Sequence, residues 1–308
     1  MVSVLEEGSA RVAGGRHGSE RASVPATGSP PGGTVLGAIA FARTGKVFDL
    51  DIGRFPGMPR HPAQPGFDVV TYMSPQGMSN KRRREGQVAH DDDNFGVVLE
   101  LVTTSMHMGT HIDALCHVTA GEDCHSFGGF NAGEHIGDKG ALALDVTTVP
   151  PIVARGVLLD VARSLGVAKL APRHGVSVEE LEAAREEAGV ELREGDVVLV
   201  RTGHLRDWPE YAFGAEPGLS LEAALWVAEK HPLAVGADNS AIEVLPSVLP
   251  RRAQPVHVEL IVERGVYLIE WLGLEELAAA RVGEFLFVCL PLKIVGATGS
   301  LVRPIAIA

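Results

Sequence analysis

The chain is 308 residues long, which is enough for one large domain or two modest ones around a sizeable buried core. Its composition, 45% hydrophobic and 21% charged, is that of a soluble globular protein and excludes disorder of the whole chain. A formal net charge of -12 argues against a nucleic-acid or anionic-membrane surface, because both need a basic face, and favours a small-molecule partner. Three cysteines without a CxxC pair argue against a disulfide scaffold and fit a reducing compartment, so we expect a cytoplasmic protein.

The first 33 residues are rich in Ser, Gly, Pro and Arg and contain no apolar run that resembles the core of a signal peptide. We predict a disordered N-terminal extension over residues 1–33 and a single folded domain over residues 34–308. No stretch reaches the roughly 18 consecutive apolar residues that span a bilayer, so we expect no association with a membrane.

From residue 34 onward, short apolar runs alternate with turns and a few helices, which is typical of a mixed sheet covered by helices and hence of an α/β fold. The predicted strands are 97–102, 156–160, 196–201, 233–236, 266–271 and 284–290, and most are too apolar to face water. The predicted helices are 177–189, which begins with the capping box of Ser177 and Glu180, and then 220–230 and 274–281. Residues 51–96, with their basic and acidic runs, are expected to form long irregular loops with solvated charges.

Histidines are concentrated in one part of the chain. Five of the twelve lie between residues 107 and 135, where an even spread would place about one. The densest part reads HMGTHIDALCH, from His107 to His117, and follows the apolar run 97–102. We expect that run to be a strand that delivers the histidines to a strand end, where sites of α/β proteins commonly form.

His107, His111 and Asp113 combine two imidazoles with a carboxylate, which is the ligand set of a catalytic rather than a structural divalent metal site. Gly109 disfavours a helix between the two histidines, so we expect a tight loop there. His111 and Asp113 point the same way only in an extended chain, whereas Asp113 and His117 converge only if a helix begins between them. The sequence leaves both conformations open.

Two other histidines and one cysteine of this region have ordinary explanations. His125 and His135 lie in a polar loop and are expected to be hydrogen-bonded rather than metal-bound. Cys116 lies among apolar residues and is expected to be a buried thiol, with a nucleophilic cysteine beside His117 as the alternative. The sequence has no GxSxG nucleophile elbow, no GxxxxGK[ST] phosphate loop and no GxGxxG motif after a strand.

The string HMGTHIDALCHV resembles the HxGTHxDxPxHF signature of the cyclase-like metal-dependent hydrolases, the family of bacterial kynurenine formamidase and isatin hydrolase. Four further parts of the sequence resemble segments of that family. They are 48–50 with 57–59, then 155–160, 195–203, and His257 with 265–270. The resemblance covers residues 34–308 and implies a mixed β/α, swivelling-type single domain.

The resemblance also implies roles for the matching residues. His107, His111 and Asp113 match the family's metal-binding triplet, and His117 matches its general acid/base. The implied chemistry is hydrolysis of an amide, formamide, lactam or lactone. A divalent ion supplies hydroxide near neutral pH and polarises the carbonyl, and His117 passes the proton to the leaving group.

The number and identity of the metal ions stay open. Members of the family with two zinc ions hold the second one with a later histidine and glutamate, which here are His257 and Glu270, whereas isatin hydrolase-like members use a single manganese. The resemblance thus implies one or two Zn²⁺ or Mn²⁺ ions, and it implies a homodimer or homotetramer. Leu115 and Val118 stand where the signature has proline and phenylalanine, so the pocket wall differs from that of the formamidase.

A non-catalytic metal- or ligand-binding protein on the same scaffold is the alternative function, and it would keep the triplet without needing His117. Residues 238–243, together with His204 and Trp208, follow predicted strands and are candidates for the pocket lining. Ordinary turn residues are the favoured interpretation for them. The substrate stays open on the sequence alone.

Overall fold

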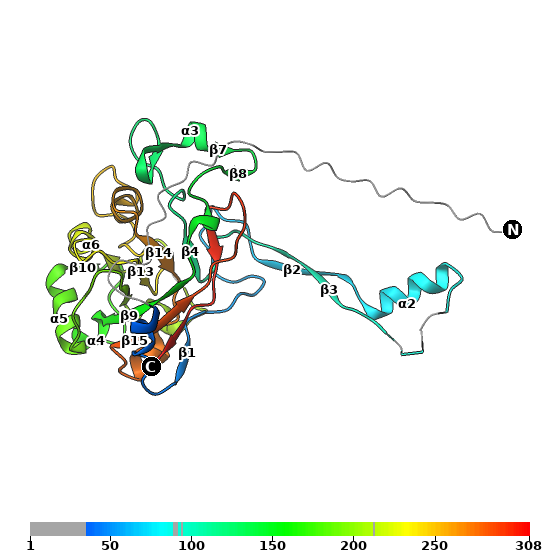
Figure 1. The fold of residues 1–308 in the computed structure, drawn as a ribbon, viewed down its shortest axis with the longest axis horizontal. Helices are drawn as coiled ribbons and strands as arrows, with labels where there is room; N and C mark the ends of the chain where they lie inside the picture. Colours follow the sequence, from blue (N-terminus) through cyan, green and yellow to red (C-terminus); the bar gives the residue numbers. More distant parts are fainter. Residues whose placement is uncertain (1–34, 89–91, 94, 212) are drawn as a thin grey trace.

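The computed structural model describes residues 35–88, 92–93, 95–211 and 213–308. The extension predicted over residues 1–33 lies outside these residues. Within them the chain builds a nine-stranded mixed sheet with helices around it and a long arm on one side (Figure 1). Across the sheet the strands are β1 (Val47–Asp49), β17 (Ile305–Ile307), β15 (Glu284–Cys289), β9 (Ile152–Asp160), β11 (Val197–Arg201), β13 (Ala234–Ala237), β14 (Tyr267–Glu270), β4 (His111–Asp113) and β16 (Gly299–Leu301). The predicted mixed α/β fold is confirmed.

Four neighbouring strands, β9, β11, β13 and β14, run parallel at the centre of this sheet, and antiparallel strands flank them on both sides. Their sequences are nearly continuous apolar runs because both faces of the sheet are covered, and almost every residue of these strands is buried. The predictions at 156–160, 196–201, 233–236, 266–271 and 284–290 are confirmed, with β9 beginning earlier than predicted. The apolar pattern does not predict the three-residue strands β16 and β17.

The three predicted helices are present with shorter bounds. They are α5 (Val178–Ala188), α6 (Leu221–Ala228) and α8 (Glu275–Ala279). At the start of α5, the Ser177 hydroxyl accepts a hydrogen bond from the Glu180 backbone N–H, and the Glu180 carboxylate accepts one from the Ser177 N–H. α5 packs against β9, α6 and the short helix α4 (Val161–Ser164), so the capped helix covers the centre of the sheet.

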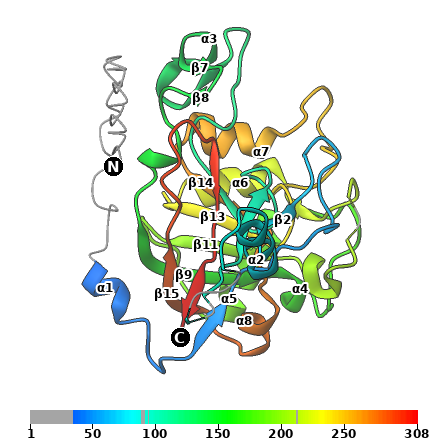
Figure 2. The same cartoon turned by 90° about the vertical axis from the view of Figure 1, so that its right-hand side faces the viewer.

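The described residues between 68 and 103 form an arm that projects from the body of the protein (Figures 1 and 2). The arm consists of β2 (Asp68–Met73), the basic helix α2 (Pro75–Arg84) and β3 (Leu99–Thr103), and β2 and β3 pair antiparallel as a two-stranded ribbon. Two expectations are therefore wrong. Residues 51–96 are not all irregular loop. The run 97–102 forms a strand as predicted, β3, but this strand is exposed and not buried. The run is exposed because its only neighbour in the described chain is one other strand.

The remaining elements are short. They are α1 (Val35–Ile39), α3 (Ala132–His135), α7 (Pro255–His257), the 3-10 turns η1 (Phe127–Gly129), η2 (Val146–Thr148) and η3 (His204–Asp207), the π-helical turn η4 (Val258–Glu263), and the strand pairs β5 (His125–Ser126) with β6 (Phe130–Asn131), β7 (Ile136–Gly137) with β8 (Gly140–Ala141), and β10 (Gly175–Val176) with β12 (Gly218–Leu219). Across the described ranges, every helix falls short of the length and apolarity that crossing a membrane requires.

Candidate metal centre

Two adjacent strands of the main sheet carry three of the predicted metal ligands. His111 and Asp113 are the first and last residues of β4, so the alternation of side chains along a strand points both to the same face. β14 pairs antiparallel with β4 and places Glu270 directly opposite His111. An extended chain, one of the two conformations that the sequence left open, is therefore what brings His111 and Asp113 together.

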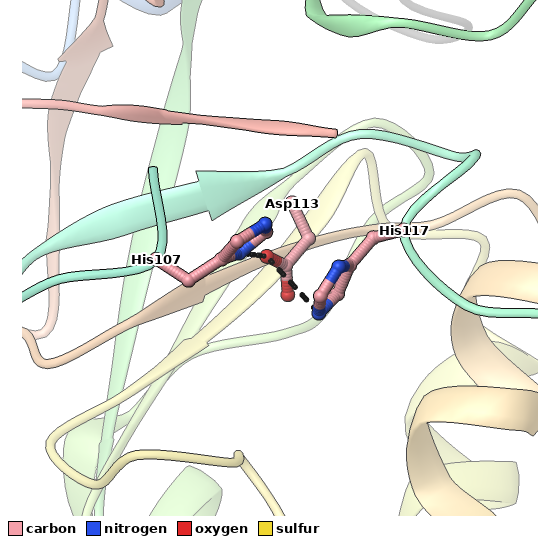
Figure 3. A group of neighbouring side chains, drawn as sticks. All are labelled: His107, Asp113 and His117. Carbon is pink, nitrogen blue, oxygen red and sulfur yellow. Dashed lines mark hydrogen bonds and ion pairs between the residues drawn. The ribbon is translucent and has the colours of Figure 1, made fainter. Parts of the chain in front are cut away.

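Asp113 is fully buried at the centre of a cluster of imidazole rings (Figure 3). Its Oδ1 atom lies 2.8 Å from His107 Nδ1 and 3.4 Å from His111 Nε2. The distance from Asp113 Oδ1 to His117 Nε2 and that from Asp113 Oδ2 to His257 Nε2 are both 3.9 Å. Three histidines of one segment and a fourth from a distant part of the chain thus converge on one carboxylate.

His117 reaches Asp113 through a turn and not through a helix. Its backbone N–H donates to the carbonyl oxygen of Ala114 at 2.9 Å, and residues 114–117 contain no helical residue. Its ring stacks on that of His107, with the centroids 3.9 Å apart and an angle of 22° between the planes. The condition that Asp113 and His117 converge only through a helix is wrong, because a single turn directly after the strand brings the ring back over Asp113.

His257 comes from a distant part of the chain, at the end of α7. Its inner nitrogen, Nε2, lies 3.1 Å from Glu270 Oε1, and its outer nitrogen, Nδ1, lies 2.8 Å from Glu243 Oε1. Burial alone would lower the pKa of His257, but its contacts with Glu243 and Glu270 outweigh burial and raise that pKa to about 10. A carboxylate on the outer nitrogen orients the ring of a metal-binding histidine, so Glu243 positions His257.

Backbone and hydroxyl groups orient two further rings. The outer nitrogen of His111, Nδ1, donates to the carbonyl oxygen of Gly109 at 2.8 Å, which leaves its Nε2 atom facing the carboxylates. Gly109 has a φ of +62°, in the left-handed region that favours glycine, so the tight loop predicted between the histidines is confirmed. His107 Nε2 lies 2.9 Å from the hydroxyl oxygen of Thr298, which precedes β16.

The carboxylates of the cluster have oxygen atoms that a cation would satisfy. Among the described residues, Asp113 Oδ2 and Glu270 Oε1 are buried without a hydrogen bond, and both lie within ion-pair distance of His257 Nε2, at 3.9 and 3.1 Å. A buried carboxylate oxygen without a hydrogen-bond partner destabilises the folded protein, because it has lost its water and gained nothing in return. Two sets of side chains have ligand atoms within 4.8 Å of one another, and they share Asp113: His107, Asp113 and His117, and His111, Asp113 and Glu270. Imidazole nitrogens and carboxylate oxygens are donors that fit Zn²⁺ or Mn²⁺.

The two carboxylates respond differently to this environment. Burial would raise the pKa of Asp113, but the surrounding histidines hold it well below its ordinary value. Burial also raises the pKa of Glu270, to about 7, and the negative charge of Asp113 adds to this effect. Two buried carboxylates that repel each other are stabilised by a cation between them, so the electrostatics agree with the donor set.

The cluster opens into a cavity of about 480 Å³ that Trp271 also lines. Trp271 has a φ of +59°, which is a strained conformation for a bulky residue, and its backbone N–H donates to the carbonyl oxygen of Asn239 at 2.9 Å. The ring of Tyr211 stacks on the indole with the centroids 4.4 Å apart. The surrounding structure therefore holds an aromatic wall beside Glu270.

Residues 238–243 contribute to this site, although the sequence favoured an ordinary turn there. Two residues of the segment line the cavity, and Glu243 binds His257. Their position directly after the buried strand β13 was the signal available in the sequence. His204 lines a separate cavity of about 340 Å³ and does not join the cluster. No sequence pattern marked Thr298, whose contact with the site depends on the pairing of β16 with β4.

His125, His135 and Cys116 lie as their ordinary explanations predict. His125 Nδ1 is 2.9 Å from Asp123 Oδ1, and His135 Nδ1 donates to the carbonyl oxygen of Asn131 at 2.9 Å. Cys116 is buried, and this burial raises the pKa of its thiol to about 12. So high a pKa leaves almost no thiolate at neutral pH, which argues against a nucleophilic cysteine.

Comparison with known proteins supports one family. The sequence model of the Cyclase family, described as "Putative cyclase", matches residues 48–244. A solved structure described as a novel cyclase is similar with a TM-score of 0.75 and 26% identity, over 89% of this chain and 90% of that chain. Isatin hydrolase A from Ralstonia solanacearum has a TM-score of 0.60 and 22% identity, over 89% and 97%. A potential metal-dependent hydrolase with cyclase activity has a TM-score of 0.53 and 21% identity, over 85% and 98%.

A search of curated proteins found no match. The family match includes His107, His111, Asp113 and His117 and ends before His257 and Glu270, whereas the similarity of fold extends over most of the chain. The family resemblance inferred from the string at residues 107–118 is confirmed: the chain belongs to the Cyclase family.

Proposed function

We propose that this chain hydrolyses a carbon–nitrogen bond of a small molecule, in an amide, formamide or lactam, with the ester bond of a lactone as a related substrate. The observation that carries the proposal is the buried cluster around Asp113 in the wall of a cavity of about 480 Å³. A cavity with a few convergent polar groups is typical of small-molecule sites. The name of the structural neighbour isatin hydrolase A supports the same class of reaction.

In this proposal His107, His111 and Asp113 would hold a divalent metal ion, Zn²⁺ or Mn²⁺, and His257 and Glu270 would hold a second one if two are bound. When bound, such an ion lowers the pKa of water to about 7 and polarises the scissile carbonyl. The chain contributes the alignment of the donor atoms. His107, His111 and His257 each have the ring nitrogen that faces away from Asp113 in contact with a fixed group. These groups are the Thr298 hydroxyl, the Gly109 carbonyl and the Glu243 carboxylate, so the three rings are oriented before a metal binds.

His117 is the proposed acid/base. Its side chain is 30% exposed, whereas those of His107, His111 and His257 are 11%, 2% and 2% exposed. It is therefore the imidazole of the cluster that a substrate in the cavity meets most directly. A histidine so placed accepts a proton from the attacking water and returns it to the leaving nitrogen or oxygen, a contribution of typically 10²–10⁴-fold in rate.

The aromatic wall supports a substrate with a flat apolar group next to the scissile bond. Trp271 follows Glu270 directly and lines the cavity, with Tyr211 stacked behind it. Aromatic rings bind other flat rings by offset or edge-to-face contact, which adds about 1 kcal/mol to the burial of area. Formylated anilines and aryl lactams combine such a ring with a carbon–nitrogen bond that water can cleave.

The experiment is a hydrolysis screen with N-formyl anilines, lactams and lactones, on protein whose metal content is measured by inductively coupled plasma analysis. Exhaustive chelation should abolish turnover, and addition of Zn²⁺ or Mn²⁺ should restore it. Turnover that survives verified removal of the metal would contradict the metal-dependent mechanism. Stoichiometric metal without hydrolysis of any of these substrates would favour the alternative, a non-catalytic binding protein.

Two variants separate the proposed roles in the cluster. His107→Ala should lose both metal and turnover, because its ring supplies a donor atom. His117→Ala should keep the metal and lose about 10²-fold or more in turnover, because its ring moves a proton. If His117→Ala turns over substrate at the wild-type rate, the acid/base role is wrong. If the His117→Ala variant binds less metal than the wild type, His117 is a metal ligand. This outcome is compatible with the structure, because His117 belongs to the donor set of His107 and Asp113.

A further inference from the structure

The cavity that contains the metal cluster adjoins a second, larger one. The first, the site cavity, has a volume of about 480 Å³ and includes Trp271 in its lining. The second, the outer cavity, has a volume of about 680 Å³ and is lined by residues 251–255, by part of η4 and by the turn at residues 120–121. Ala253 and Gln254 belong to the lining of both cavities. A substrate whose reacting bond lies at the cluster can therefore extend past these two residues into the outer cavity.

The outer cavity presents two arginine side chains that have no acidic partner. Arg251 and Arg252 line it, and both residues are exposed. Among the described residues, neither guanidinium forms an ion pair or a hydrogen bond. Arg264, the third arginine of the lining, differs because its Nε donates to Glu259 Oε1 at 2.8 Å. The charges of Arg251 and Arg252 are therefore free to bind a ligand.

The backbone holds these two arginines in a tight turn. The Arg252 N–H donates to the carbonyl oxygen of Leu249 at 3.3 Å, and Arg251 has a φ of +61°. Residues other than glycine adopt this left-handed conformation infrequently, and such strained residues cluster at sites that bind ligands. The same segment continues into α7, which carries His257 of the metal cluster. The strained turn and the metal centre thus belong to one short stretch of chain.

The site cavity adds a cation from another part of the chain. Arg60 lines this cavity, and its Nη1 donates to the carbonyl oxygen of Gln64, a neutral group that leaves the charge of the guanidinium uncompensated. Outside the metal cluster, the two linings together contain four arginines and two glutamates, which are Arg60, Arg251, Arg252, Arg264, Glu259 and Glu263. The chain as a whole has a net charge of -12, so this positive excess is local to the two cavities.

The chemistry of the guanidinium group indicates what it binds here. Its planar fork of N–H donors matches the two oxygens of a carboxylate, and hydrogen bonds between opposite charges are stronger than neutral ones. Glu263 lines the same cavity, so a singly charged carboxylate suits the small excess of positive charge better than a dianionic phosphate. A neutral group of the same shape would gain much less from the two arginines.

We propose that Arg251 and Arg252 bind a carboxylate at the end of the substrate that is remote from the scissile bond. This inference rests on the proposed function and adds the class of substrate to it, an aryl formamide or aryl lactam that carries an acid group. Trp271 contacts the aromatic ring in the site cavity while the arginines hold the acid in the outer one. Neither arginine touches the reacting atoms, so both determine affinity and specificity and not the chemical step.

The first test measures binding and needs no turnover. Titration calorimetry on protein of known metal content compares para-aminobenzoate and the longer para-aminophenylpropanoate with their neutral carboxamides. At least one acid should bind about tenfold more tightly than its carboxamide. The double variant Arg251→Gln with Arg252→Gln should bind acid and carboxamide equally. Equal affinities of both pairs for the wild type would overturn the proposal. A preference for the acid that persists in the double variant would also overturn it, because the carboxylate would then bind elsewhere.

The second test measures release of formate from the corresponding formamides. The double variant should raise KM for the acid substrate about tenfold and leave kcat, and the KM of the carboxamide, within about twofold of the wild type. Arg281→Gln is the matched control, because Arg281 is also exposed, has a φ of +56° and lies outside both linings. An equal rise in KM for this control would overturn the proposal. Failure to hydrolyse any of these compounds would contradict the proposed function, whereas the binding comparison decides the role of the arginines in either case.

Discussion

Gly299 leaves just enough room for the ring of His107, and this makes Gly299→Ala a sharp test of the metal centre. Gly299 lies in β16, opposite Asp113 in β4. A Cβ atom at this position would lie 2.6 Å from His107 Cε1 and 2.8 Å from the carbonyl oxygen of Ile112. Both distances are too short for a real contact, and Ile112 lies between His111 and Asp113 in the strand that carries them.

The magnitude follows from what must move. Extra atoms in a packed interior lower the free energy of unfolding by about 1–3 kcal/mol. Here the new methyl group would meet the backbone carbonyl oxygen of Ile112 on one side, and that atom cannot move without moving the strand. The ring of His107 can yield more easily than the strand, so we expect it to leave its place beside Asp113. Loss of an outer partner of a ligand typically lowers metal affinity about 10–100-fold, which corresponds to about 1.4–2.7 kcal/mol, and displacing the proposed ligand His107 should cost at least as much.

The assay is competition for Zn²⁺ and Mn²⁺ with a chromophoric chelator, together with thermal unfolding of the metal-free protein. Gly273→Ala is the matched control, because the nearest atom to its Cβ would be Ile52 Cγ2 at an ordinary 3.5 Å. Gly299→Ala should lose affinity for metal and Gly273→Ala should keep it. If both variants bind metal as tightly as the wild type does, then His107 is not a ligand or the packing argument is wrong.

Three further predictions concern Glu243, His204 and the cysteines. Glu243→Gln keeps the shape of the side chain but removes the negative charge that orients His257. The affinity for the metal ion that His257 binds should therefore fall about 10–100-fold in the same competition assay. An unchanged affinity would exclude the positioning role of Glu243. Burial lowers the pKa of His204 to about 4, so the unfolded chain binds more protons and the folded chain should lose about 2 kcal/mol as the pH falls from 6.5 to 4. Urea unfolding of His204→Gln should show a flatter pH dependence, and parallel curves would contradict the assignment. Burial raises the pKa of Cys116 and Cys289 to about 12, whereas Cys124 is exposed. An alkylating reagent at pH 8 should therefore label the native protein quickly only at Cys124, which mass spectrometry would show. Rapid labelling of all three cysteines would refute the burial of Cys116 and Cys289.

Local patterns in the sequence were sufficient for the elements whose causes are local. The capping box of Ser177 and Glu180 specifies the start of α5, and the apolar runs specify β9, β11, β13, β14 and β15. The spacing from His107 to His117 identifies the family. Gly109 predicts the tight loop because its left-handed backbone is a property of one residue.

Only the tertiary structure decided which strands are buried and which side chains meet in the metal centre, because burial and such contacts depend on segments that are distant in sequence. The run 97–102 has the composition of a buried strand, yet it lies exposed in the arm, since burial is determined by neighbours and not by composition. Pairing of β4 with β14 and β16 places Glu270 and Gly299 beside the histidines. His257 and Glu243 meet through a bend of the chain that no periodicity signals. The sequence by itself determined the chemical groups of the centre, and the sheet topology determined which of them face one another.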